Sequence, residues 1–131
     1  MDAPPTELFA RIIQLAESTF EHVEYSTDYA PERAILRLRG LFAVHRVFVI
    51  ELIANTTRKH SYYVLRGDWV EIGFDNSSDP DAIRLKYSKI GMEHTGELVP
   101  HAHRMDKSEI VLTEEMTFEK FVDWLKANLT E

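Results

Sequence analysis

Two histidines separated by a single residue form the clearest chemical pattern in this sequence. Side chains two positions apart in an extended chain point to the same side, so His101 and His103 are expected to act together. Two adjacent imidazoles can serve as general base and general acid in cleaving a phosphodiester, or they can bind a metal ion. Arg104 and Lys107 follow closely and would attract an anionic substrate. We predict that His101 and His103 are the catalytic pair.

The histidine pair also fits a purely structural role or a metal site. In the structural role, Pro100 holds His101 in a surface loop and both rings only form hydrogen bonds with the backbone. In the metal site, Asp75 or His94 supplies a further ligand, since imidazole and carboxylate groups suit zinc, manganese or iron. No spacing in the sequence fixes such a ligand set, so we expect a site that works without a metal or another cofactor.

The composition removes several other chemistries. The chain of 131 residues, expected to form one domain, has no cysteine, which excludes disulfides, thiolate zinc sites, iron–sulfur clusters and cysteine nucleophiles. The sequence also lacks a phosphate-binding P-loop, a dinucleotide-binding glycine motif, a serine-hydrolase G-x-S-x-G motif and the H-E-x-x-H zinc motif. Chemistry with a nucleotide cofactor is therefore not expected.

The periodicity of apolar residues predicts the elements that hold these groups. One helix is expected over 8–20 with Thr6 as its N-cap, and another over 118–129 with Thr117 as its N-cap. Between them, apolar runs and alternations predict strands, the last of them a short edge strand, over 34–39, 44–54, 59–65, 69–75 and 83–88. Residues 91–107 are expected to be irregular. The predicted fold is α+β, an antiparallel four- to five-stranded meander packed with an N-terminal and a C-terminal helix.

Alternate side chains of a strand point to opposite sides, so the strands also predict two faces. One face is apolar and is expected against the helices: Leu36, Leu38, Tyr62, Val64, Val70, Ile72 and Phe74. The other face is polar: Arg37, Arg39, Tyr63, Glu71 and Asp75. Arg37, Arg39 and Tyr63 are predicted to bind the substrate, as is Arg104. Asp75 is predicted to be a catalytic residue that orients one imidazole, although a solvated face without a function is the alternative.

Charge is unevenly distributed along the chain. The net charge of −7 argues against a protein that coats nucleic acid without selectivity. Residues 33–66, however, carry seven basic side chains and a single acidic one, Glu51, so this stretch would present a basic face to an anion. The first 30 residues contain several acidic groups and no long apolar run. Neither a signal peptide nor a membrane segment is expected, and the expected location is cytoplasmic.

Four short motifs follow one another in the last two thirds of the chain: Tyr62-Tyr63-Val64, Gly73-Phe74-Asp75-Asn76, Leu98-Val99-Pro100-His101-Ala102-His103 and Glu114-Glu115-Met116-Thr117-Phe118. Over residues 33–129 this order resembles the TumE family of small bacterial and archaeal toxin components. That family has a tyrosine-rich strand, an aspartate-asparagine pair, a proline-histidine cluster and an acidic-threonine start of the final helix. Gly73 stands where the family usually has an arginine, and residues 77–81 lack its histidines. The resemblance implies a prokaryotic toxin–antitoxin setting.

The residues and the resemblance together predict a toxin-like ribonuclease that needs no metal. In this hypothesis the arginines hold phosphate, while His101 and His103 exchange protons with the attacking 2′-hydroxyl and the leaving oxygen. RNA and an antitoxin protein are the expected partners, a membrane is not, and the oligomeric state is left open. The first alternative is a non-enzymatic binding or regulatory module whose basic face, with Arg37 and Arg39, docks an acidic partner. The second is a metal-dependent enzyme with an H-x-H site.

Overall fold

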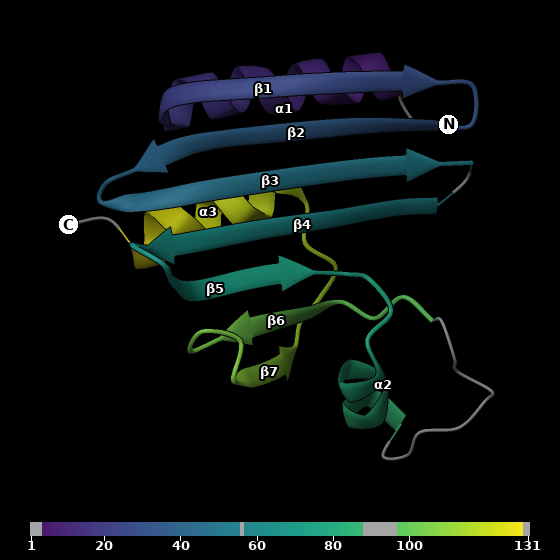
Figure 1. The fold of residues 1–131 in the computed structure, drawn as a ribbon, viewed down its shortest axis with the longest axis vertical. Helices are drawn as coiled ribbons and strands as arrows, with labels where there is room; N and C mark the ends of the chain where they lie inside the picture. Colours follow the sequence, from purple (N-terminus) through teal and green to yellow (C-terminus); the bar gives the residue numbers. More distant parts are fainter. Residues whose placement is uncertain (1–3, 56, 88–96, 130–131) are drawn as a thin grey trace.

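The computed structural model describes residues 4–55, 57–87 and 97–129. Within these residues the elements follow in this order: α1 (Pro5–Thr19), β1 (Glu21–Ala30), β2 (Arg33–Phe42), β3 (His45–Ala54), β4 (Thr57–Arg66), β5 (Trp69–Asp75), α2 (Pro80–Tyr87), β6 (His101–Arg104), β7 (Glu109–Leu112) and α3 (Phe118–Asn128). Each strand pairs antiparallel with the next, in one seven-stranded sheet of order β1 to β7 (Figure 1). The predicted α+β class and antiparallel meander are confirmed. The predicted number of strands, four to five, is wrong, because the sheet has seven.

Three strands were not predicted from the sequence, because their residues show no clear alternation of apolar and polar side chains. Almost every residue of β1 is exposed, and its sequence is rich in charged and hydroxyl side chains. β6 and β7 have four residues each, which is shorter than most strands and too short to show a period. Backbone pairing with a neighbour holds all three in place, β1 on β2, β6 on β5 and β7 on β6.

The predicted edge strand over 83–88 is wrong, because Pro80–Tyr87 form the helix α2. Asp79 Oδ1 accepts a hydrogen bond from the Asp81 N–H (2.8 Å), and the Asp79 carbonyl oxygen accepts one from the Ile83 N–H (2.9 Å). Asp79 therefore caps the helix, and a proline in the following position suits a first helical turn. These start signals outweigh the short apolar alternation that predicted a strand.

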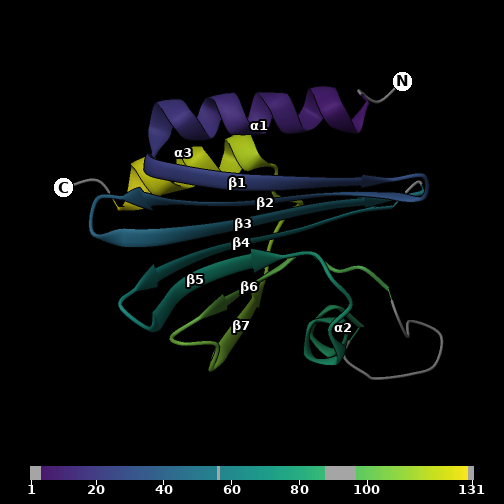
Figure 2. The ribbon, with the colours of Figure 1, turned by 45° about the horizontal axis from the view of Figure 1, so that its top comes forward.

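The helices α1 and α3 lie on the same face of the sheet and enclose the core (Figure 2). The core joins apolar residues of both helices to alternate residues of the strands: Phe9, Ile12, Ala16, Leu36, Leu38, Val47, Val49, Tyr62, Val64, Ile72, Phe74, Phe118, Phe121, Val122 and Leu125. Burying one large side chain of this kind stabilises the fold by about 1.5–3 kcal/mol. Thr117 caps α3 as predicted, since its hydroxyl accepts a hydrogen bond from the Lys120 N–H (3.2 Å). The predicted cap Thr6 lies inside α1, which begins at Pro5.

One β-bulge changes the predicted faces of β5. The pairing of β4 with β5 shifts between Val64 and Leu65, so that Glu71 has no partner in the ladder and Val70 pairs with Leu65. Glu71 consequently turns toward the helix side, where its Oε1 lies 3.7 Å from His45 Nε2. The predicted placement of Glu71 on the polar face is therefore wrong, because a bulge interrupts the two-residue period.

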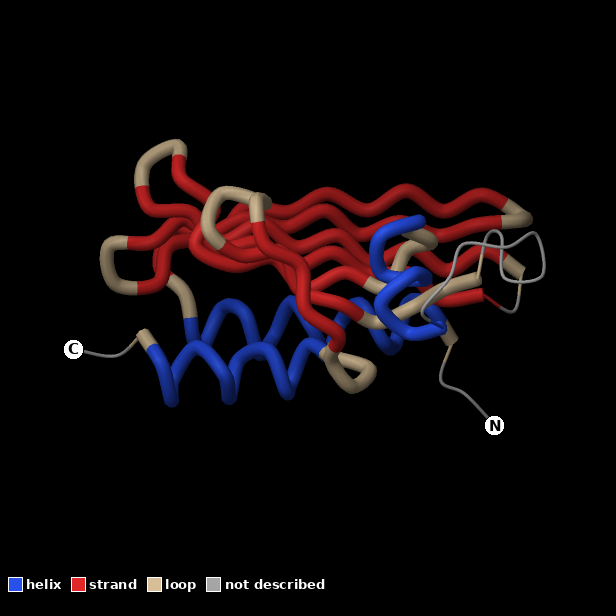
Figure 3. Tube along the Cα trace, turned by 90° about the horizontal axis from the view of Figure 1, so that it is seen from below, coloured by secondary structure: helices blue, strands red, loops and turns tan. Residues whose placement is uncertain are grey.

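The short helix α2 covers part of the opposite face, next to β7. Ala82 and Ile83 of α2 form a small second core with Val99, and Tyr87 and Ile110 pack against it. Figure 3 shows that no described helix covers this face over β1 to β4. None of the described helices combines the length and apolar character that crossing a lipid bilayer requires.

Candidate functional site

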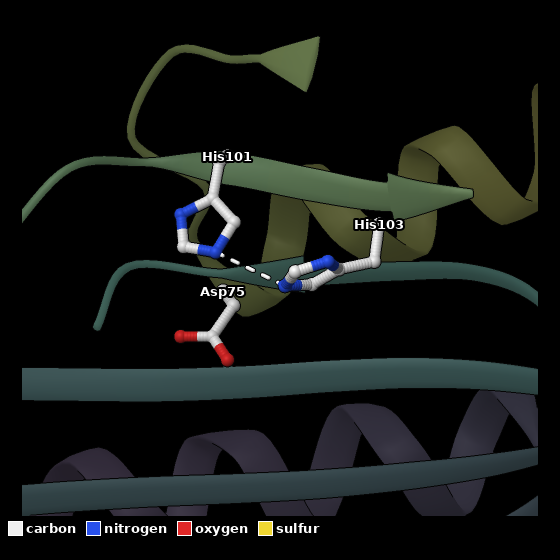
Figure 4. A group of neighbouring side chains, drawn as sticks. All are labelled: Asp75, His101 and His103. Carbon is white, nitrogen blue, oxygen red and sulfur yellow. Dashed lines mark hydrogen bonds between the residues drawn. The ribbon is translucent and has the colours of Figure 1, made fainter. Parts of the chain in front are cut away.

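Asp75, His101 and His103 come together on the face of the sheet that α2 partly covers. Asp75, the last residue of β5, pairs with His101, the first residue of β6, so their side chains project to the same side. His103 lies two positions further along β6 and shares that side. Figure 4 shows the imidazoles of His101 and His103 meeting at their Nε2 atoms, with Asp75 beside them. Cross-strand register thus joins a carboxylate to the histidine pair.

The spacing of the two imidazoles matches that of two ligands on one metal ion. His101 Nε2 lies 3.2 Å from His103 Nε2, and one ligand atom from each of Asp75, His101 and His103 lies within 4.8 Å of the others. Two nitrogens that each bind a tetrahedral zinc ion at roughly 2.0–2.1 Å are about 3.3 Å apart. The distance is also that of a hydrogen bond between the two rings, and it suits two nitrogens that share a single ion.

The backbone holds His101 in one tautomer. The side chain is fully buried, and its Nδ1 lies 2.6 Å from the carbonyl oxygen of Val99. A carbonyl oxygen only accepts hydrogen bonds, so Nδ1 carries a proton, and in the neutral ring Nε2 presents a lone pair to His103. Backbone carbonyls orient metal-binding histidines in proteins in the same way.

Asp75 is fixed in its orientation by two hydrogen bonds. Its Oδ1 accepts one from the Ser77 N–H (2.7 Å) and its Oδ2 accepts one from the Ser61 hydroxyl (3.1 Å). Burial alone would raise the pKa of Asp75, but the hydrogen bonds from Ser77 and Ser61 outweigh it and hold the pKa below its usual value. Asp75 is therefore a carboxylate at neutral pH and can serve as a metal ligand.

Asp79 brings a second carboxylate to the site from the loop before α2. Its Oδ2 lies 3.8 Å from His101 Nε2 and 3.9 Å from His103 Nε2, while its Oδ1 caps the helix. We name Asp75, Asp79, His101 and His103 the histidine–aspartate site. The sequence analysis missed Asp79, although an aspartate before a proline is a signal for a helix start.

Tyr63 lies beside the site on β4. The register places Tyr63, Gly73 and His103 in one row across β4, β5 and β6. The Tyr63 ring lies so close above Gly73 that a Cβ at that glycine would overlap it. Burial, and then the carboxylates of Asp75 and Asp79, raise the pKa of Tyr63 to about 12. The Tyr63 hydroxyl therefore stays protonated and remains a hydrogen-bond donor.

Solvent reaches the site from the side of His103 and Asp79. Their side chains are 17% and 25% exposed, whereas His101 is not exposed at all. Burial, and then the neighbouring His101, lower the pKa of His103. Its ring is consequently neutral at neutral pH, which is the form that binds metal ions.

The arginines predicted to bind the substrate do not gather at this site. Arg37 and Arg39 lie on the same face of the sheet, but β2 is four strands away from β6, which is about 19 Å at the usual strand spacing. Arg104 follows the histidine pair in β6 and points to the opposite face, where it lines a hollow with Trp124. Of the predicted substrate-binding residues, only Tyr63 borders the histidines.

The comparisons with known proteins do not identify this site. No family model, curated protein or solved structure matches the chain, so the resemblance to the TumE family stays a prediction. His94, the other residue considered as a metal ligand, lies outside the described residues. The fold and the site define an α+β protein with a histidine–aspartate cluster.

A second buried polar cluster lies on the helix side of the sheet. The fully buried carboxylate of Glu51 accepts hydrogen bonds from the Tyr62 hydroxyl and from the Arg58 guanidinium (3.2 and 3.3 Å). The His60 ring stacks on the Tyr62 ring, with 4.6 Å between centroids, and the backbone N–H of His60 donates a hydrogen bond to Asn76 Oδ1 (2.9 Å). Burial, and then the charge of Arg58, lower the pKa of His60 to about 4. We name these five residues the Glu51 network.

Proposed function

We propose that the protein binds one divalent transition-metal ion through Asp75, His101 and His103 and uses it to activate water for a hydrolytic reaction. The observation that carries this proposal is the convergence of three ligand atoms, in which two imidazole nitrogens lie 3.2 Å apart. Three protein ligands leave a coordination position for water, as in catalytic zinc sites, whereas structural zinc sites are filled by four protein ligands. Zinc, manganese and iron suit a mixed set of imidazole and carboxylate ligands.

Asp79 is the group that takes up the proton in this proposal. A bound metal ion lowers the pKa of a coordinated water to near neutrality. Asp79, whose Oδ2 lies within 3.9 Å of both histidine nitrogens, accepts the proton that the water loses. The resulting hydroxide adds to the substrate, the bond to the leaving group breaks, and the leaving group takes the proton from Asp79.

Metal binding by protein purified without a histidine tag tests the proposal. Elemental analysis and calorimetric titration with zinc, manganese and ferrous iron are expected to give about one ion per chain in the parent. The double variant His101→Ala/His103→Ala is expected to lose this binding, and so is His103→Gln, a milder change that keeps the buried ring of His101. The control is His22→Asn, because His22 is an exposed histidine on β1 with φ of 54°, a value that asparagine tolerates.

Circular dichroism of each variant checks that the fold is kept. The proposal fails if the parent holds no metal and binds none of these ions. It also fails if the folded double variant binds a metal as tightly as the parent.

The metal-independent ribonuclease predicted from the sequence is a second proposal that uses the same two histidines. It rests on the adjacency of the two rings and on the resemblance, which also supplies the proposed antitoxin partner. This mechanism needs both rings to reach the substrate, whereas His101 is fully buried and its Nε2 faces His103. The metal-dependent reaction therefore comes first. Incubation of the purified protein with RNA in excess chelator tests the ribonuclease: breakdown by the parent alone, and not by the double variant, supports it, and intact RNA contradicts it.

A further inference from the structure

A lysine without an acidic partner among the described residues stands beside the histidine–aspartate site. Lys107 lies in the turn between β6 and β7, and its Nζ lies 5.1 Å from the centroid of the Tyr63 ring. Its side chain is exposed, and it forms no ion pair with any residue that the structure describes. Arg104, in the same hairpin, is by contrast paired with Glu109 (3.4 Å). Lys107 is thus a cation whose charge the described part of the fold leaves available next to the site.

The turn that carries Lys107 adopts an unfavourable backbone conformation. Met105, Asp106 and Lys107 have φ values of 49°, 53° and 70°, in the left-handed region that few residues other than glycine adopt. Asp106 fastens this turn to β5, because its N–H donates to the Val70 carbonyl oxygen (2.9 Å) and its Oδ1 accepts from the Val70 N–H (3.1 Å). Backbone strain of this kind is retained where the position of a side chain matters. The turn holds the ammonium group over Tyr63.

The metal ion and Lys107 offer two neighbouring places for an anion. Asp75 and Asp79 offset the charge of a divalent ion in the site, whereas no acidic side chain among the described residues pairs with Lys107. An anion that takes the open coordination position of the metal would therefore pair with Lys107 as well. The Tyr63 side chain, which lies in one row with Gly73 and His103, adds a hydroxyl donor for the same anion.

We propose that the metal ion, Lys107 and Tyr63 together bind a phosphoryl group, so that the substrate is a phosphate ester. This inference rests on the proposed metal site. A phosphoryl group spreads its charge over several oxygens, so one oxygen contacts the metal ion while another contacts the ammonium group. In the hydrolysis the water oxygen adds to phosphorus, the bond between phosphorus and the ester oxygen breaks, and the alcohol leaves with the proton held by Asp79.

Titration of the metal-loaded protein with inorganic phosphate, followed by calorimetry, tests the inference. The protein carries zinc or manganese, whichever the parent binds more tightly. Lys107→Met is expected to weaken phosphate binding about tenfold, the usual scale for a lost hydrogen bond to a charged group, with unchanged metal affinity. Lys107→Arg is expected to keep most of the phosphate affinity, because it keeps the charge. Lys126→Met, at an exposed lysine on α3, is the control and is expected to change neither affinity.

Three results would overturn the inference while leaving the metal site intact. They are an unchanged phosphate affinity in Lys107→Met, phosphate binding that does not need the metal, and equal affinity for phosphate and acetate. Loss of both metal and phosphate affinity in Lys107→Met overturns it as well, because the lysine would then support the fold rather than bind the anion. A parent protein that takes up no metal contradicts the proposed function itself, before any phosphate is added.

Discussion

Two clusters of buried ionisable groups among the described residues differ in how their charges are satisfied. In the Glu51 network, the carboxylate meets the guanidinium of Arg58 and the hydroxyl of Tyr62. In the histidine–aspartate site, two carboxylates and two imidazole nitrogens face one another, and no cationic side chain of the described residues lies among them. The first arrangement is complete without a ligand, whereas the second becomes complete when a cation binds.

This difference separates polar groups that stabilise the fold from polar groups that serve a function. Breaking a buried ion pair on one side leaves an uncompensated charge and is strongly destabilising. Removing one acid from a site that lacks a compensating cation carries no such cost, and the effect appears in ligand binding instead. Substitutions in the two clusters should therefore give opposite patterns of stability and binding.

The largest effect is expected from Arg58→Met in the Glu51 network. Of its hydrogen-bond partners among the described residues, Glu51 would keep only the Tyr62 hydroxyl while it stays fully buried. Burial already raises the pKa of Glu51 against the opposing charge of Arg58, so loss of the guanidinium removes its main compensation. Because the Arg58 side chain is 40% exposed and Glu51 is fully buried, urea denaturation should show a loss of about 3 kcal/mol in the free energy of unfolding, the lower end of the range for a buried pair. Arg33→Met, which breaks an exposed ion pair with Asp28, is the control, and a loss no larger than that of the control would remove the distinction between the clusters.

The next largest effect is expected in the pH dependence of stability, to which His60 contributes. Its pKa is about 4 in the folded protein and about 6.5 in the unfolded chain, so the unfolded chain binds the proton first as the pH falls. The stability that this group contributes is complete above pH 6.5 and is lost between pH 6.5 and 4, by about 2 kcal/mol at pH 5. Urea denaturation at pH 7 and pH 5 should show this loss in the parent and a smaller one in His60→Phe, which keeps the stacking on Tyr62. Equal losses in the two proteins would show that His60 is not buried in its neutral form.

A smaller effect is expected from Asp79→Asn in the histidine–aspartate site. Asparagine caps a helix as well as aspartate, so the free energy of unfolding without metal should change by less than about 0.5 kcal/mol. The metal affinity should fall about tenfold, the lower end of the range for groups that act around a ligand set. Calorimetric titration of both proteins with zinc measures this difference. A large loss of stability with unchanged metal affinity would place Asp79 with the structural groups.

Much of the fold could be predicted from single segments, because amphipathic periods are properties of one element. The stripe of α3 and the alternation around Leu36 and Tyr62 identify the core directly. The strand β1 was not predictable in this way, since its place depends on pairing with β2 and not on burial of its own side chains. The bulge at Glu71 is likewise invisible in the residue pattern of β5.

The site could be predicted only as far as residue type and spacing reach. Spacing and residue type predict that His101, His103 and Asp75 act together, and the register of β5 with β6 explains why they meet. Arg104 is predicted to bind the substrate with the histidines, but it follows His103 directly in β6 and therefore points to the opposite face. The positions of Asp79 and Lys107 depend on a helix cap and on a turn with positive φ, and neither follows from spacing alone.

The smallest effect is expected from substitutions of Arg37 and Arg39 on β2. The sequence singled out these arginines, but they lie far from the site. Arg37→Ala and Arg39→Ala should leave the metal and phosphate affinities of the metal-loaded protein unchanged, because the site lies about 19 Å away at the usual strand spacing. Arg39 forms an ion pair with Glu24 (2.5 Å), but both side chains are more than half exposed, so its loss should cost less than about 0.5 kcal/mol. Calorimetry and urea denaturation measure the two quantities. A loss of phosphate affinity in Arg37→Ala would show that the anion site extends across the sheet. If the protein binds an acidic partner and Arg37→Glu abolishes that binding, the binding module would be favoured over the enzyme.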